Sequence, residues 1–318
     1  MSETKSTGAL QLSREYFFQV AQPSLVQSFP ELSERLAAGL AGNGSECFGY
    51  DDELSRDHDW GVDFFIWTLE QDRGSVPALA EWKDKLFKSH PPEFRRDISD
   101  YGARIAVLTC GDFFHSLIGV NECPSSISEW LRPPEENFSL AVNGEVFIDY
   151  PGFFTKTRCN LLCYFPEDIR RKRIAARCMA LAQTGQYNHE RVAKRGDMVT
   201  LRTVLSKFTE SAIAMVYLLN KVYRPYYKWA FRGLQELPVL GQDASRLLLD
   251  IAENYGLDEI SLEKRQECIS NLCRRFATEL KTQSLSDSDD FFLAFHGESV
   301  QQRIEDGFLR SLPVQYKI

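Results

Sequence analysis

The chain has 318 residues and a mass of 36.5 kDa, which favours one large domain or two domains of ordinary size. Hydrophobic residues make up 43% of it and charged residues 26%, a composition that excludes disordered, collagen-like and disulfide-scaffold proteins. The formal net charge of −8 argues against a long nucleic acid as the partner, because phosphate-backbone binding needs a strong positive face.

The sequence also bears on the compartment. The N-terminal residues lack an apolar segment of the kind found in signal peptides, and no run approaches the roughly 18 apolar residues of a membrane span. The eight cysteines show no C-x-x-C spacing, which predicts reduced thiols rather than disulfides or a zinc site. We therefore expect a cytoplasmic protein with no membrane partner.

The first half of the chain mixes extended and helical signals. The apolar residues before Leu40-Ala41-Gly42-Asn43-Gly44-Ser45 predict a short strand that ends in a tight turn, and the aromatic run 59–67 predicts a second strand. Residues 79–88 and 97–118 have helical patterns. Two short apolar runs around Asn143-Gly144 within 138–150 predict a β-hairpin that ends at Asp149.

From Pro166 onward the pattern is helical almost throughout. In 202–223 apolar residues recur every three or four positions, which predicts one long helix with a buried face. Other helices are expected over 167–184, 226–236, 243–255, 261–282 and 289–310. The sequence therefore predicts two domains, 1–165 with mixed structure and 166–318 with helices alone.

Charge is distributed unevenly along the chain. Residues 156–202 contain eleven basic and four acidic side chains, so the remainder of the chain carries a net −15. Residues 46–60 contain six carboxylates and only one basic side chain. A metal–triphosphate site needs carboxylates for the metal and cations for the phosphates, so the pattern fits such a site. The alternative interpretation is that the basic run is a solvated helix face.

The segment 40–67 contains the residues that most clearly indicate a catalytic site. Gly44 lets the backbone approach an anion, and the Ser45 hydroxyl can bind triphosphate oxygens. After eleven intervening residues come Asp57 and Asp59, which would point to the same face of a strand and could bind one or two divalent ions. A third carboxylate is needed from a neighbouring strand, and Asp149 is our candidate. An Asp-x-Asp pair by itself also occurs by chance in surface loops.

These residues resemble the signature of the polymerase-beta-like nucleotidyltransferases, in which Gly-Gly or Gly-Ser precedes Asp-x-Asp or Asp-x-Glu by about nine to thirteen residues. The longer string 44–61, with G-S-E, G-Y-D-D and D-H-D-W-G in that order, is similar to an uncharacterised bacterial family of that superfamily. The similarity continues at 144–158, 164–170, 194–197 and 218–229. The resemblance implies an α+β protein, with a minimal nucleotidyltransferase domain (a small mixed β-sheet with flanking helices) followed by an all-α helical bundle.

The resemblance also implies roles for single residues. It makes Gly44 and Ser45 the triphosphate-binding turn, and Asp57, Asp59 and Asp149 the catalytic carboxylates and ligands of Mg²⁺ or Mn²⁺. The superfamily usually has an apolar residue between the first two carboxylates, whereas this chain has a histidine at position 58. That departure leaves the carboxylate pair intact.

The helical region adds candidates for binding the nucleoside triphosphate, for which ATP is our first choice. Lys228 and Tyr226 begin a helix after a proline, and a lysine with aromatic residues at such a corner could bind phosphates and base. Arg195 is a further candidate for phosphate contact. The alternative interpretation of the Tyr226–Lys228 corner is an aromatic plug between domains with a solvated lysine.

The expected activity is transfer of a nucleoside monophosphate from a triphosphate to a hydroxyl acceptor, with release of pyrophosphate. The acceptor would be a small molecule, cationic and aminoglycoside-like, or a protein side chain. A different class of function is a catalytically silent nucleotide sensor or interaction protein of the same fold. A third interpretation makes the helical region a dimerisation module, and the sequence allows a monomer or a homodimer.

Overall fold

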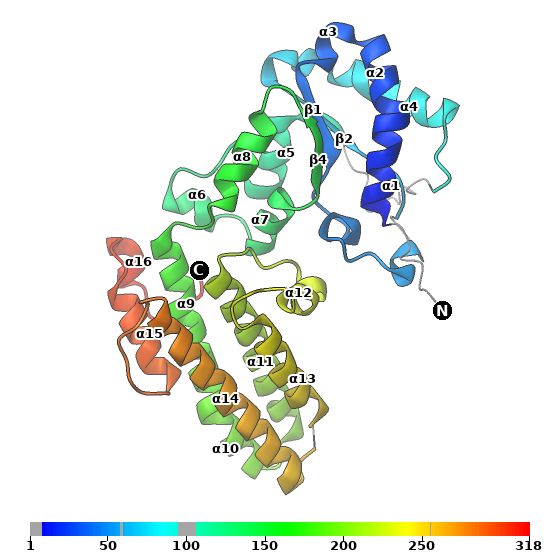
Figure 1. Cartoon of the computed structure of the whole chain (residues 1–318). Coiled ribbons are helices and arrows are strands. Elements are labelled where there is room, and N and C mark those ends of the chain that lie inside the picture. Colours follow the sequence, from blue (N-terminus) through cyan, green and yellow to red (C-terminus); the bar gives the residue numbers. More distant parts are fainter. Residues whose placement is uncertain (1–7, 58–59, 95–105, 255) are drawn as a thin grey trace. The chain divides into compact units, whose positions relative to one another are not determined.

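The computed structural model describes residues 8–57, 60–94, 106–254 and 256–318. The chain divides into two compact units, Met1–Cys163 and Tyr164–Ile318, close to the boundary predicted after residue 165. Strands occur in the N-terminal unit, together with helices, while the described part of the C-terminal unit is helical (Figure 1). The predicted α+β class is therefore confirmed.

The N-terminal unit is built on a four-stranded mixed sheet in the order β3-β2-β1-β4. Its strands are β1 (Leu36–Leu40), β2 (Phe65–Thr68), β3 (Val107–Thr109) and β4 (Glu145–Asp149). Strand β1 is antiparallel to both β2 and β4, and β2 is parallel to β3. The β1–β4 register shifts between Ala38 and Gly39, where a Cβ on Gly39 would lie 2.4 Å from the Glu145 carbonyl oxygen. Only glycine fits this irregular crossing.

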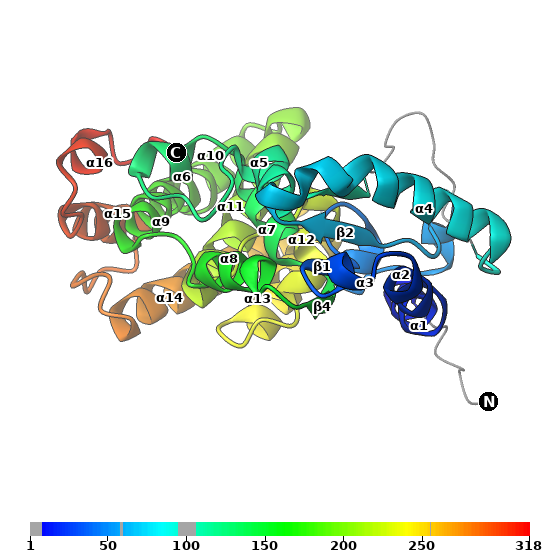
Figure 2. The same cartoon turned by 90° about the horizontal axis from the view of Figure 1, so that it is seen from above.

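Helices cover both faces of the sheet (Figure 2). One face packs on α1 (Ala9–Tyr16), a π-helical turn (Phe17–Ala21), α2 (Gln22–Ser28), α3 (Pro30–Ser33) and α4 (Val76–Ser89), with a core that contains Phe17, Phe64 and Ile66. On the other face Trp67 of β2 stacks on Phe154 at 3.9 Å between ring centroids. That side is formed by α5 (Cys110–Ile118), α6 (Ile127–Leu131), α7 (Glu135–Val142) and α8 (Phe153–Leu162).

Two sequence predictions for this unit are wrong. The predicted hairpin around Asn143-Gly144 does not form, because its first run belongs to α7 and β4 pairs with β1 instead. The predicted helix 97–118 is in its described part strand β3 followed by α5; residues 97–105 lie outside the described ranges. Thr109 separates the two elements, since its side chain caps α5 by accepting a hydrogen bond from the Asp112 N–H at 3.0 Å.

The C-terminal unit consists of helices around one large apolar core. The predicted long helix is α11 (Met198–Asn220), and its apolar stripe is buried, as Phe208, Ala212 and Met215 show. The predicted helix 289–310 is instead two helices. The full order in this unit is α9 (Glu167–Leu181), a π-helical segment (Ala182–Asn188), α10 (His189–Lys194), α11, α12 (Tyr227–Leu234), α13 (Gly241–Glu253), α14 (Glu259–Thr282), α15 (Leu293–Gln302) and α16 (Gly307–Ser311).

The described ranges include no helix that combines the length and the apolar character needed to cross a membrane. The longest helices, α11 and α14, place polar side chains on one side and apolar ones in the core of the unit. Both are therefore helices of a folded bundle.

The basic run of α9 has a structural role that neither interpretation of the sequence anticipated. Arg170 is 2% exposed and its Nε donates to the Leu218 carbonyl at 2.8 Å. Lys172 is fully buried, and its Nζ donates to the Pro313 and Val314 carbonyls at 2.7 and 3.1 Å. These cations hold distant backbone segments together inside the unit, which leaves them unavailable to a phosphate.

Candidate functional site

The turn after β1 contains two glycines with positive φ angles. Gly42 and Gly44 have φ values of +92° and +127°, which side-chain-bearing residues rarely adopt. Ser45 follows as the first residue of a short 3₁₀ helix, Ser45–Phe48. Its side chain is half-buried and makes no hydrogen bond to any residue in the described ranges. The Ser45 hydroxyl is therefore available to a ligand.

Asn143 and Gly144 fix this turn from the neighbouring strand. The Asn143 side chain accepts from the Gly42 N–H at 2.7 Å and donates to the Gly42 carbonyl at 2.8 Å. The Gly144 N–H donates to the Cys47 carbonyl at 2.8 Å, and Arg158 donates to the Gly144 carbonyl at 2.9 Å. The Asn-Gly pair, from which we predicted a hairpin, instead holds the turn after β1 in place through these hydrogen bonds. We call this set of contacts the Asn143 clamp.

A buried carboxylate lies against the same turn. Glu46 is only 2% exposed, and a Cβ added to Gly44 would fall 2.3 Å from both of its carboxylate oxygens. Position 44 therefore needs glycine both for its backbone conformation and for the space that Glu46 fills. The Gly-Ser-Glu sequence therefore has a packing role, whether or not the turn also binds a ligand.

The residues that flank the Asp-x-Asp motif lie at the same edge of the sheet as this turn. Because β1 and β2 are antiparallel, the end of β1 and the approach to β2 share one edge. Asp51 accepts from the Ala9 N–H and from the Trp60 indole N–H, both at 2.9 Å. The Arg56 guanidinium lies 4.6 Å from the Trp60 ring centroid.

The motif itself is only partly covered. The backbone of Asp57 closes the 3₁₀ helix Glu53–Asp57, while its side chain and all of His58 and Asp59 lie outside the described residues. The topology therefore supports the position of the motif, and its carboxylate geometry stays a prediction.

Asp149 lies at the opposite end of the sheet from the Gly-Ser turn. It pairs with Ala37 near the start of β1, while Glu145 pairs with Leu40 at the end that leads into the turn. Ala37 and Leu40 are three positions apart in the strand, which corresponds to about 10 Å. The prediction that Asp149 completes a site with Gly44 does not agree with this register.

Asp149 has a local structural role instead. One of its carboxylate oxygens accepts from the Thr155 N–H at 2.7 Å in the first turn of α8, and the other is buried with no hydrogen-bond partner among the described residues. Burial, with the Asp149 charge as a second cause, raises the pKa of the Cys110 thiol to about 12. Asp149 therefore faces α5 and α8.

Glu145 is the described β4 carboxylate that lies at the turn. Arg14 of α1 forms an ion pair with it at 2.8 Å, so Glu145 faces the α1 side of the sheet. Residues 145 and 149 would share a face in a regular strand, and the irregular register between them places them on opposite faces. Sequence reasoning missed Glu145 because nothing local in the sequence marks that register shift.

A metal ion needs a set of ligands that the described residues alone do not supply. Among the residues that the structure covers, no group of three or more His, Cys, Asp or Glu side chains is arranged to hold one. The three-carboxylate set Asp57, Asp59 and Asp149 does not fit one ion at the turn, because Asp149 is at the other edge. Only the pair at 57 and 59 remains from that prediction.

The nucleotide-binding candidates of the helical unit are separated from one another. Arg195 is exposed and directly follows α10, ahead of α11, whereas Tyr226 and Lys228 lie beyond the far end of α11. A 23-residue helix is about 33 Å long, and Figure 1 shows α10 and α12 at its two ends. Arg195 and the Tyr226–Lys228 corner are therefore separate candidates for nucleotide binding, because one nucleotide is too short to contact both. Lys228 lies exposed, 5.0 Å from the Trp229 ring centroid.

Comparison with known proteins adds one family. A family described as a domain of unknown function (DUF4037) matches residues 130–230. The match includes β4 and ends within α12, so it contains Glu145, Asp149 and Lys228 but not the Gly-Ser turn. No curated protein and no solved structure matches the chain.

Proposed function

We propose that the N-terminal unit is a nucleotidyltransferase that moves a nucleoside monophosphate from a triphosphate, with ATP as first choice, to a hydroxyl acceptor. The observation that supports it most is topological. The glycine-rich turn after β1 and the segment that leads from Asp57 to β2 lie at one edge of the sheet. This topology supports the proposal, because the activity needs the turn and the carboxylate segment close together.

The turn contributes the groups that would bind the triphosphate. The backbone at Gly44 allows close approach of phosphate oxygens, and the free Ser45 hydroxyl donates a hydrogen bond to one of them. The Asn143 clamp holds the turn rigid, so little conformational entropy is lost on binding.

The carboxylates would divide the chemistry. Asp57 and Asp59 are the proposed ligands of Mg²⁺ or Mn²⁺, which when bound neutralises triphosphate charge. Glu145 replaces Asp149 in our assignment as the acceptor of the hydroxyl proton, because it lies at the turn edge. The acceptor is a small molecule, cationic and aminoglycoside-like, or a protein side chain.

The test measures pyrophosphate release from radiolabelled ATP, with aminoglycosides as candidate acceptors and with label on the protein as the sign of self-transfer. Asp57→Asn and Asp59→Asn should each lower turnover by about 100-fold or more. Asp52→Asn is the matched control, since Asp52 belongs to the same loop and its carboxylate accepts hydrogen bonds from the Ser55 N–H and hydroxyl, both at 3.0 Å. Full activity in Asp57→Asn would overturn the proposal.

A second pair of variants tests whether the proton acceptor is Glu145, as we propose, or Asp149, as we expected from the sequence. Glu145→Gln should lower turnover, whereas Asp149→Asn should mainly destabilise the start of α8. Stabilisation of the folded chain by Mg²⁺-ATP with no pyrophosphate release under any condition would favour the silent nucleotide sensor instead.

A further inference from the structure

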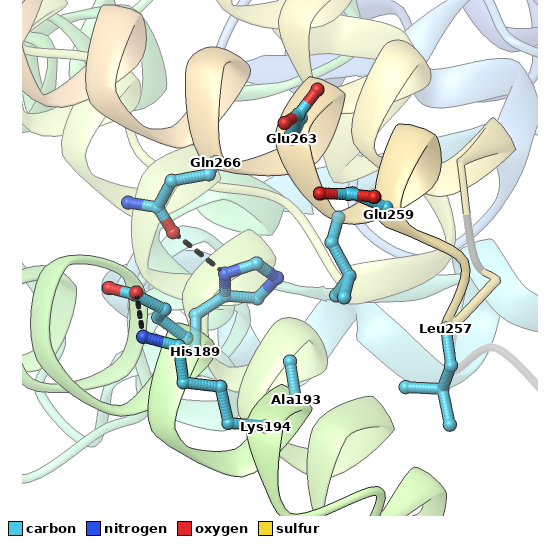
Figure 3. Close-up of a pocket in the computed structure, with 9 residues that line it drawn as sticks. His189, Ala193, Lys194, Leu257, Glu259, Glu263 and Gln266 are labelled. Atoms are coloured by element: carbon cyan, nitrogen blue, oxygen red, sulfur yellow. Dashed lines mark hydrogen bonds and ion pairs between the residues drawn. The ribbon is translucent and has the colours of Figure 1, made fainter.

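The C-terminal unit contains a pocket between α10 and the start of α14 (Figure 3). Its volume is about 430 Å³, within the range of small-molecule sites. Three segments contribute to it: α10, the loop before α14 and the first two turns of α14. The lining residues that carry the argument are His189, Lys194, Leu257, Glu259, Leu262 and Glu263.

One wall of the pocket is apolar. Ala193 is buried and Leu262 is partly buried, and both belong to a small hydrophobic cluster with Val192 and Leu201. Leu257 is 36% exposed at the edge. This wall suits a ligand with a hydrocarbon body, because covering it removes apolar surface from water.

The polar base of the pocket is formed by the side chains of His189 and Gln266. Arg265 Nε donates to His189 Nε2 at 3.2 Å, so the proton of the imidazole is on Nδ1, which donates to the Gln266 side-chain oxygen at 2.9 Å. Burial lowers the pKa of His189, and the Arg265 charge lowers it further, so the ring is neutral at pH 7. His189 therefore brings no positive charge to the pocket.

Of the charged side chains that line the pocket, two carboxylates have no ion-pair partner among the described residues. Glu190 forms an ion pair with Lys194 at 2.5 Å, drawn as a dashed line in Figure 3. Glu259 and Glu263 make no ion pair or hydrogen bond to any residue of the described ranges. They stand four positions apart on α14, a spacing at which like charges repel. A cation between them would remove that repulsion.

We propose that this pocket binds a small organic cation with an apolar body. The ammonium group lies between Glu259 and Glu263, and the hydrocarbon part covers Leu257, Leu262 and Ala193. The proposal combines the charge deficit with a cavity whose apolar wall is already formed. It is independent of the proposed nucleotidyl transfer, because none of these residues belongs to the Gly-Ser turn or its carboxylates.

A matched set of probes tests the charge requirement on the intact chain. 4-Phenylbutylamine, 4-phenylbutan-1-ol and 4-phenylbutanoate share one hydrocarbon body and differ in charge. Isothermal titration at pH 7 and low salt should show binding of the amine, at least about tenfold weaker binding of the alcohol, and none of the acid. Equal affinity for amine and alcohol, or no binding of the amine, would overturn the proposal.

Variants then locate the site. The double variant Glu259→Gln, Glu263→Gln should weaken amine binding by about tenfold or more, and each single variant should weaken it less. The control Glu298→Gln, which removes one carboxylate from α15 outside the pocket, should leave it unchanged. Leu257→Ser should weaken 4-phenylbutylamine but not n-butylamine, since only the longer body reaches the wall. Thermal melts establish that each variant is folded, and unchanged amine affinity in the folded double variant would refute the assignment.

Discussion

The two units use their charged residues in opposite ways. In the N-terminal unit Glu145, at the end of the sheet that leads into the glycine-rich turn, forms an ion pair with Arg14 in which both side chains are about half exposed. In the C-terminal unit the basic residues of α9 are buried and bond to backbone carbonyls of distant segments. The density of charged residues along the sequence therefore does not predict their role. A buried charge stabilises the fold through hydrogen bonds, whereas an exposed one is accessible to a ligand.

The largest effect is expected at the glycine that clamps the turn. Gly144 has φ +69°, and a Cβ there would lie 2.0 Å from the Leu40 carbonyl oxygen. Gly144→Ala should lower the free energy of unfolding by about 3 kcal/mol or more, since it combines backbone strain with a clash against β1.

Gly152→Ala is the matched control for that variant. Gly152 has φ +70° and nothing within 4 Å of the added Cβ, so only the backbone strain of about 1 kcal/mol applies. Urea denaturation measures both variants. Equal losses would show that the contact between Gly144 and β1 does not contribute to the stability of the turn.

The next prediction compares the loss of stability on replacing a buried and an exposed basic residue of the segment 156–202. Lys172→Met keeps the hydrocarbon stem but leaves the Pro313 and Val314 carbonyls without their donor, at a cost of about 2 kcal/mol. Arg195→Met on the surface should change stability by less than about 0.5 kcal/mol. Thermal or urea unfolding compares them, and a neutral Lys172→Met would mean that water replaces the lysine.

The pH dependence of stability should come from the helical unit. Burial lowers the pKa of both His189 and His296, and the buried Nδ1 of His296 has no hydrogen-bond partner among the described residues. Below about pH 6.5 these two histidines are protonated in the unfolded chain but stay neutral in the folded unit. The free energy of unfolding therefore falls as the pH falls. It is constant, for these groups, above that pH.

Denaturation from pH 8 to pH 5 measures this slope. Replacing both histidines by glutamine should flatten it, because the difference in bound protons disappears. A slope that stays unchanged in the double variant would assign the pH dependence to other groups.

The smallest effect concerns nucleotide binding at the two ends of α11. Lys228→Gln should weaken ATP binding by about threefold if the α12 corner contacts the phosphates, because an exposed charge contributes less than about 1 kcal/mol. Arg195→Gln should have no effect, given its position about 33 Å away along α11. A larger loss in Arg195→Gln than in Lys228→Gln would contradict this prediction.

The sequence predicted the elements whose signals are local. The apolar stripe of α11, the helix α4 and the strand before the Gly-Ser turn follow from periodicity and glycine positions within one segment. Strand β3 and the partner of β4 could not be found in that way, since each pairs with residues far away in the sequence.

For the candidate site, the sequence by itself determined which residue types are available: a Gly-Ser turn, a carboxylate pair and a basic run. Only the tertiary structure decided which of them meet. The antiparallel pairing of β1 with β2 supports a position of the Asp-x-Asp motif near the Gly-Ser turn. The irregular register of β4 places Asp149 at the opposite end of the sheet and on the other face, and it places Glu145 at the turn. The physical reason is that one shifted residue in a strand reverses every side chain beyond it, and no local pattern records that shift.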